Sequence, residues 1–195
     1  MRTEGSSLRH DPVSMSEARR AFAAHPLAAF VATGFGSGLS PIMPGTAGSI
    51  VGLVLGWLGA RALASHTGSV GVAVGLLTSG LLVGLLGVAV SGPVCRALGE
   101  DDPGCVVIDE ISGQLIASAA VPLVAPRLPA LLLAGAWIGS FVLFRFYDIV
   151  KPGPIHGLQE LPGGWGVVVD DVAGGIAAAA TLLAAGWLAV RFGWI

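Results

Sequence analysis

The sequence contains few charged residues, and this scarcity excludes most soluble architectures. Only 11% of its 195 residues are charged, whereas 54% are hydrophobic. Ordinary soluble domains carry about 25% charged residues. A soluble helical bundle with a very apolar core is the alternative, but ten basic and twelve acidic residues could hardly cover its surface. We therefore favour an integral membrane protein.

Basic stripes, cysteine motifs and a secretory signal are also missing. The net charge is −2, so we expect no nucleic-acid partner. Cys95 and Cys105 have no metal-ligand spacing and are expected to be buried thiols. The first apolar stretch begins only near Ala21, after a polar run that ends in Arg19–Arg20, and this order does not fit a signal peptide.

The chain is predicted to form one all-α domain behind a polar tail. Residues 1–20 lack periodicity and are expected to be flexible or to lie on a surface, and residues 21–195 suit a single helical membrane domain. Ala21–Ala32 is too short to cross a bilayer and is predicted to lie at its interface. The candidate crossings are Ala47–Leu63, Ser69–Val90, Ile111–Ala125, Ala130–Tyr147 and Val172–Val190. Because Pro122 should end or kink the third segment, we predict an integral membrane bundle of about four to five apolar helices.

Glycines at four-residue spacing recur in the first two of these segments. They stand at Gly48, Gly52 and Gly56, and again at Gly80 and Gly84. In membrane helices this small-xxx-small pattern lets two backbones approach closely. A purely structural helix-packing protein is therefore one hypothesis, although it leaves the acidic pairs described below unexplained.

A segment rich in glycine, proline and hydroxyl residues, Thr33–Ser49 (TGFGSGLSPIMPGTAGS), precedes the first crossing. Glycine permits positive φ and proline removes backbone donors, so such a segment can present N–H groups and hydroxyls to an anion. It matches neither the Walker pattern nor the dinucleotide-binding pattern. A plain connector at the cytoplasmic face is the alternative interpretation.

Charge counting favours a cytoplasmic N-terminus if all five segments cross. The basic residues on that side would be Arg2, Arg9, Arg19, Arg20, Arg96, Arg145 and Lys151. Those on the other side would be Arg61, Arg127 and Arg191. The excess on the first side agrees with the positive-inside rule.

The same topology brings Asp109–Glu110, Asp148 and Asp170–Asp171 to the cytoplasmic boundary. An acid at a helix N-terminus is stabilised by about 0.3–1 kcal/mol, which explains single acids but not two adjacent pairs in apolar runs. Charges near a membrane core cost about 2.5–3.5 kcal/mol each, and clustered carboxylates repel one another unless a cation intervenes. Oxygen ligands without convergent His or Cys predict Mg²⁺, with Mn²⁺ as a substitute.

A metal site beside Arg145 and Lys151 at a lipid surface predicts metal-assisted hydrolysis of a phosphate-bearing substrate. Arg145 is equally placed for a local ion pair with Asp148, and Lys151 for snorkelling toward lipid headgroups. His156 fits a structural role or protonation of the leaving alkoxide. The segment Glu100–Asp102 is interpreted as an exposed turn outside the site. A small cation transporter or channel using the same carboxylates is the second functional hypothesis, although acids at one level argue against conduction.

Four blocks resemble the phosphatidylglycerophosphatase A family in order and spacing: TGFGSGLSPIMPGTAGS, VVIDEISGQLIA, FRFYDIVKPGPI and GGWGVVVDDVAGG. The resemblance covers roughly residues 32–178. It implies a Mg²⁺-dependent, multi-pass enzyme of the bacterial inner membrane, with its active site on the cytoplasmic side. Such an enzyme hydrolyses phosphatidylglycerophosphate to phosphatidylglycerol and inorganic phosphate.

The resemblance also implies roles for individual residues. The positions that match as metal ligands and catalytic residues are Asp109, Glu110, Asp148, Asp170 and Asp171, with Lys151 as a further catalytic residue. Those expected to bind substrate are Thr33, Gly34, Gly36, Ser40, Thr46, Ser49 and Lys151, beside Arg145. The sequence leaves the oligomeric state open.

Overall fold

The structure is a computed structural model, and it describes residues 15–124, 126 and 128–193 of the chain. Within these ranges every regular element is helical and no strand occurs, which confirms the all-α prediction. Most of the predicted tail lies outside the described residues. The predicted interfacial stretch divides at His25 into α1 (Met15–Ala24) and α2 (Pro26–Ala32), which both pack against α4. Its position at a membrane surface stays a prediction.

Four helices are long and apolar enough to cross a membrane. They are α3 (Pro44–Ala64), α4 (Ser69–Leu98), α7 (Ala130–Val150) and α9 (Gly164–Arg191). Each contains one of the predicted segments. Helix α9 begins at Gly164 instead of Val172, so Asp170 and Asp171 lie inside the helix and not at its start.

The third predicted crossing, Ile111–Ala125, is not a membrane span of its own. Helix α5 covers Ile108–Ser118 and ends before Pro122, and the short α6 (Val121–Val124) follows. The 11 residues of α5 rise by about 16 Å, far less than the ~30 Å of a bilayer's hydrocarbon core. Helix α5 packs against α3, α4, α7 and α9, and all its residues except Glu110 are buried. It is therefore a central helix enclosed by protein.

Glycines and small polar groups allow this close packing around α5. A Cβ at Gly52 on α3 would lie 2.9 Å from the Gln114 Cβ, and one at Gly80 on α4 would lie 2.6 Å from Ile116 Cγ1. The Ser112 hydroxyl donates a hydrogen bond of 2.8 Å to the Gly80 carbonyl. The four-spaced glycines thus serve contacts within one chain, as small residues do between membrane helices.

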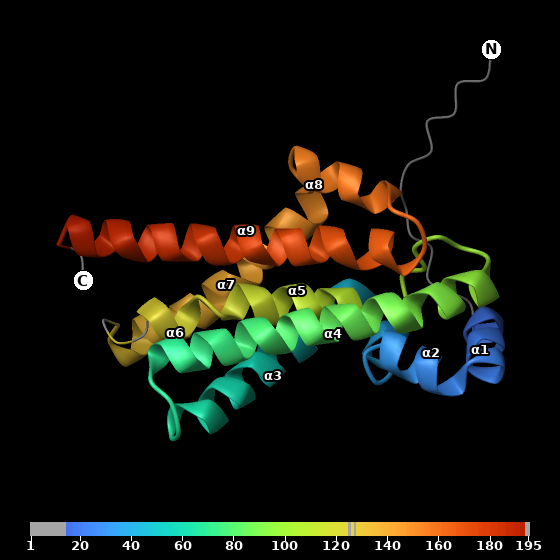
Figure 1. The fold of residues 1–195 in the computed structure, drawn as a ribbon, viewed down its shortest axis with the longest axis horizontal. Helices are drawn as coiled ribbons and strands as arrows, with labels where there is room; N and C mark the ends of the chain where they lie inside the picture. The colour runs from blue at the N-terminus through green and yellow to red at the C-terminus, as the bar shows by residue number, and fades with distance from the viewer. Residues whose placement is uncertain (1–14, 125, 127, 194–195) are drawn as a thin grey trace, which may run out of the picture.

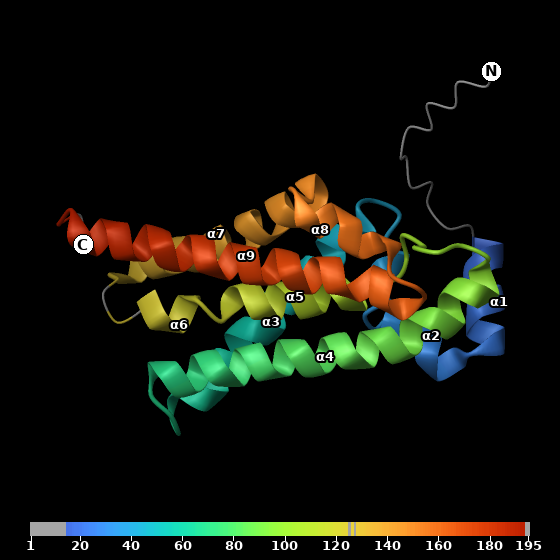
Figure 2. The same cartoon turned by 45° about the horizontal axis from the view of Figure 1, so that its top comes forward.

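The two ends of the bundle are formed by different helices. Helices α1 and α2, the C-terminal end of α4 and the start of α9 lie together at one end (Figures 1 and 2). The α3–α4 turn, α6 and the C-terminal end of α9 lie at the other. Helices α5 and α6 return the chain from the first end to the second (Figure 1), so α7 begins at the second end although α5 is too short to be the predicted third crossing. Cys95 and Cys105 are buried free thiols, as expected.

Candidate active site

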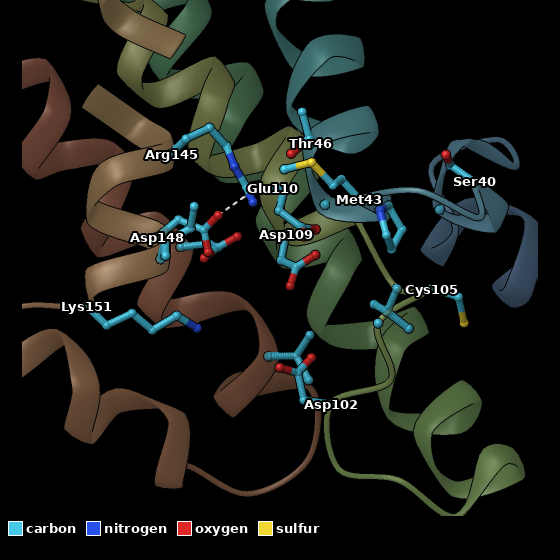
Figure 3. Close-up of a pocket in the computed structure, with 18 of the residues that line it drawn as sticks. Ser40, Met43, Thr46, Asp102, Cys105, Asp109, Glu110, Arg145, Asp148 and Lys151 are labelled. Carbon is cyan, nitrogen blue, oxygen red and sulfur yellow. Dashed lines mark ion pairs between the residues drawn. The ribbon is translucent and has the colours of Figure 1, made fainter. Parts of the chain in front are cut away.

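A cavity of about 870 Å³ opens where α5 begins and α7 ends. Its walls come from the segment that precedes α3, the loop between α4 and α5, the end of α7, the short α8 (Pro154–Gly157) with the 3₁₀ turn η3 (Leu158–Glu160), and α9. Figure 3 shows side chains from these distant segments directed into one space. Its lining brings carboxylates and basic side chains together at one level of the bundle.

Three carboxylates form what we call the acid cluster: Asp109, Glu110 and Asp171. One oxygen from each lies within 4.8 Å of the others. Asp109 is only 6% exposed and Asp171 only 2%. Within the described residues, Asp109 Oδ1, Glu110 Oε2 and Asp171 Oδ2 are buried without a hydrogen-bond partner. Buried, unpaired carboxylates are costly, and converging oxygens of this kind are the ligands of hard divalent cations. The donor set therefore fits such an ion.

The ionisation of the two acids on α5 supports this interpretation. Burial raises the pKa of Asp109, and the nearby charges of Glu110 and Asp171 raise it further. Burial is also the main cause of the raised pKa of Glu110. Without a cation the cluster disfavours its own charge, because each carboxylate is desolvated and repelled by the next.

The remaining two predicted ligands pair with basic side chains. Asp148 forms an ion pair with Arg145, one turn earlier on α7, as the local alternative predicted (Figure 3). Asp170 Oδ2 lies 2.5 Å from Lys151 Nζ. Burial would lower the pKa of Lys151, but the hydrogen bond and charge of Asp170 outweigh this effect and raise it. The structure thus divides five predicted ligands into three clustered and two paired acids.

Close packing of α5 against α9 places Asp171 near the acids of α5. A Cβ at Gly113 would lie 2.6 Å from the Asp171 carbonyl oxygen, and a Cβ at Gly175 would lie 2.4 Å from the Gly113 carbonyl oxygen. Asp109 and Glu110 occupy the first turn of α5, where the helix dipole favours negative charge. Glycines therefore set the distance between the two halves of the acid cluster.

The start of α3 forms the opposite wall. Pro44 occupies the first turn and no side chain caps the helix, so the N–H groups of Gly45 and Thr46, which both line the cavity, have no side-chain cap. Thr46 and Ser40 both line the cavity. Gly45 leaves room for other groups, since a Cβ there would collide with Glu110 Oε1 and lie 3.3 Å from Arg145 Nη1. An uncapped helix N-terminus is a common anion-binding element.

Four residues predicted to bind substrate do not line the cavity: Thr33, Gly34, Gly36 and Ser49. The Thr33 hydroxyl donates to the Phe30 carbonyl at 3.3 Å, and the glycines turn the chain with φ of 54° and 91°. Ser49 lies inside α3, where its hydroxyl donates to the Gly45 carbonyl at 2.9 Å and accepts a 3.2 Å hydrogen bond from Arg145. These residues therefore do not line the cavity and instead support the backbone of the segment that does.

Sequence reasoning missed Asp102. The segment Glu100–Asp102 is exposed as predicted, but Asp102 also lines the cavity, and its charge contributes to the raised pKa of Asp109. The loop between α4 and α5 folds back and places Asp102 below Asp109 in Figure 3. The sequence contains no signal for this fold-back beyond the acidic side chain itself. His156 also lines the cavity.

Comparison with known proteins connects this geometry to a family. The model of the family described as phosphatidylglycerophosphatase A matches residues 30–186. A phosphatidylglycerophosphatase A from Haemophilus influenzae is 37% identical over 156 residues, which are 79% of this chain and 85% of the relative. One from Escherichia coli is 32% identical over 176 residues, 89% of this chain and 90% of the relative.

A third relative comes from Bacteroides thetaiotaomicron, and its name provisionally gives phosphatidylinositol-3-phosphatase as its activity. It is 32% identical over 166 residues, 83% of this chain and 95% of the relative. No solved structure matches the chain. The family model spans most of the sequence, including all three members of the acid cluster. The resemblance of the four blocks is thereby confirmed, and the chain belongs to the phosphatidylglycerophosphatase A family of phosphoric monoester hydrolases.

Proposed function

We propose that the protein hydrolyses the terminal phosphate of phosphatidylglycerophosphate to give phosphatidylglycerol and inorganic phosphate, with Mg²⁺ as cofactor and Mn²⁺ as a substitute. The observation that carries this proposal is the acid cluster, whose buried oxygens lack partners while two basic side chains enter the same cavity. The names of two relatives supply the substrate. Gathering of the acids in one cavity argues against a transporter or channel, whose charges would follow a path through the membrane.

The acid cluster is the proposed metal site. Asp109, Glu110 and Asp171 would hold the ion, because one oxygen of each lies close to the others and each carboxylate has a buried oxygen without a hydrogen-bond partner among the described residues. When bound, such a cation polarises a phosphoryl oxygen and lowers the pKa of a coordinated water. Asp148 and Asp170, which were predicted as ligands, instead hold two basic side chains in this proposal.

The chain's own cationic groups would bind the phosphate. Arg145 and Lys151 enter the cavity from the end of α7, and the ion pairs with Asp148 and Asp170 restrict how each side chain is oriented. The N-terminus of α3 adds N–H groups and the positive end of its dipole, beside the hydroxyl of Thr46. Positioned positive charge of this kind stabilises the charge that develops during phosphoryl transfer.

Hydrolysis requires a proton for the leaving group. The reaction forms a bond between phosphorus and a water oxygen and breaks the bond between phosphorus and the glycerol oxygen, so the departing alkoxide must be protonated. His156 lines the cavity from α8 and is our candidate for this donor, since histidine is the side chain that most often acts as a general acid.

We place the site at the cytoplasmic face of the bacterial inner membrane. At the cavity end, α1 contains positions Arg19 and Arg20, the last turn of α4 contains Arg96, and the end of α7 contains Arg145, followed by Lys151. At the far end, the last turns of α3 and α9 contain Arg61 and Arg191, while Arg2, Arg9 and Arg127 lie outside the described residues. This asymmetry supports a cytoplasmic cavity through the positive-inside rule.

A phosphate-release assay tests the proposal. Purified protein is given phosphatidylglycerophosphate in mixed micelles, in EDTA and after addition of Mg²⁺ or Mn²⁺. We expect no release in EDTA and recovery with either ion. Phosphatidylinositol-3-phosphate is assayed in parallel, because one relative's name points to that headgroup. Turnover that persists in EDTA would contradict the metal site, and a preference for the inositol lipid would replace the proposed substrate.

A further inference from the structure

The cavity has an apolar edge that phosphate chemistry does not use. We call it the apolar rim: Leu39 and Met43 before α3, with Ile149 and Val150 at the end of α7. All four side chains line the cavity, and all are between 44% and 67% exposed. Met43 and Lys151 lie on opposite sides of the acids in Figure 3. Large apolar side chains at the mouth of a charged cavity gain stability only if something covers them.

The apolar rim continues into the exposed surface of a membrane helix. On α7, Ile138, Val142 and Phe146 are exposed and repeat at four-residue spacing, and Ile149 follows three residues later. Residues three and four apart share one helix face. A single apolar row therefore leads from the middle of α7 to the mouth of the cavity.

Helix α3 has a matching row. Ile50, Val54 and Leu58 are exposed at four-residue spacing, which again defines one face, and Met43 is the residue directly before the helix. Helices α3 and α7 pack against each other. Both rows lie on helices apolar enough to cross a membrane, so the rim is continuous with surface that faces lipid in a bilayer.

We propose that the apolar rim is the portal through which the acyl chains of a lipid phosphomonoester leave the cavity. The phosphate lies near the acid cluster, and the chains pass over Met43 and Ile149 to run along α3 and α7. This inference rests on the proposed function and specifies where the acyl chains of the substrate lie, in addition to its phosphate. A headgroup without chains would leave the rim uncovered, whereas a diacyl lipid matches both the basic cavity and its apolar edge.

Chain-length kinetics test the portal. Met43→Asn and Ile149→Asn each place a polar group on the rim, and asparagine tolerates the left-handed backbone of Met43 (φ 51°). The matched control is Ile176→Asn on α9, which changes an exposed isoleucine (52%) that lies outside the cavity and off both apolar rows. Phosphate release is measured with dioleoyl and dihexanoyl forms of phosphatidylglycerophosphate in mixed micelles.

We expect the rim variants to raise KM for the dioleoyl lipid about three- to tenfold, because each loses one apolar contact with the chains. KM for the dihexanoyl lipid should rise by no more than about twofold, and activity on this lipid also shows that the variants fold. The control should match the unaltered protein on both.

Three outcomes would overturn the portal while leaving the proposed function intact. These are equal effects on both lipids, an equal effect of the control Ile176→Asn, or a change of oligomeric state in Ile149→Asn without chain-length dependence, which would make the rim a contact between copies of the chain. Failure of the unaltered protein to release phosphate from either lipid would instead remove the proposed function.

Discussion

Two neighbouring groups of carboxylates differ in how the chain compensates their charge. Asp148 and Asp170 each form an ion pair with a basic side chain that lines the cavity. Both groups contain buried oxygens without a hydrogen-bond partner among the described residues, but in that part of the chain the acid cluster forms no ion pair. Both groups are enclosed by helices that are apolar over most of their length.

This difference distinguishes carboxylates with a structural role from carboxylates that bind a ligand. A chain that needed only to fold would lose stability by holding three desolvated carboxylates within 4.8 Å of one another. The paired acids show that the same fold can supply counter-charges. We therefore assign the paired acids to positioning and the acid cluster to metal binding, and the following substitutions test that assignment.

The largest effect is expected from removing one charge of the acid cluster. Asp171→Asn should lower phosphate release by more than about a hundredfold, since even partners of metal ligands contribute 10–100-fold. In EDTA the same variant should melt at a higher temperature than the unaltered protein, because a desolvated repulsive charge is gone. Thermal unfolding with and without EDTA measures this, and Mg²⁺ should stabilise the variant less than the unaltered protein. A lower melting temperature in EDTA would show that the charge is compensated within the protein.

A second substitution turns a paired acid into an unpaired one. Lys151→Met leaves Asp170, whose side chain is 3% exposed, without its counter-charge, and we expect a loss of about 3–5 kcal/mol in the free energy of unfolding. Adding Asp170→Asn should restore most of that stability. Activity should stay low in the double variant, because the proposed phosphate contact is still missing. Recovery of activity together with stability would assign Lys151 a structural role only.

The division between paired and clustered acids could not be predicted from sequence. Asp170 and Asp171 are adjacent on α9, and adjacent helix residues point about 100° apart, so one reaches Lys151 and the other the cluster. Which residue does which depends on the rotation of α9 against α5. That rotation is set by contacts of Gly113 and Gly175, and no local pattern encodes it.

The membrane helices were more predictable than the central one. Uninterrupted apolar runs identified α3, α4, α7 and α9, because length and hydropathy are local properties. The start of α9 at Gly164 differs from the predicted Val172, because the glycines after Pro162 indicate a loop and not a helix. Helix α5 resembles a crossing in sequence because its residues are mostly apolar. Its enclosure by four neighbours depends on tertiary packing alone.

A third substitution lies between the acid cluster and the Arg145–Asp148 ion pair. Gly45→Ala places a methyl group against Glu110 of the cluster and Arg145 of an ion pair. Both contacts are with ends of flexible side chains, so the protein should fold while both groups shift. Displacements of this kind cost about 10- to 100-fold in turnover, measured as kcat. Gly157→Ala is the control, because a Cβ there meets nothing within 4 Å, and an equal loss in both variants would contradict the assignment.

The smallest expected effect concerns two hydroxyl groups, one that lines the cavity and one that does not. Thr46 lines the cavity, whereas the Thr33 hydroxyl is occupied by the Phe30 carbonyl, although sequence alone gave both the same role. Thr46→Val should raise KM about two- to tenfold, the value of one hydrogen bond, and Thr33→Val should change it by less than about twofold. Equal increases would mean that the whole Gly-rich segment reorganises around the phosphate when substrate binds. Only unequal increases fit a rigid wall in which groups already satisfied by the protein take no part in binding.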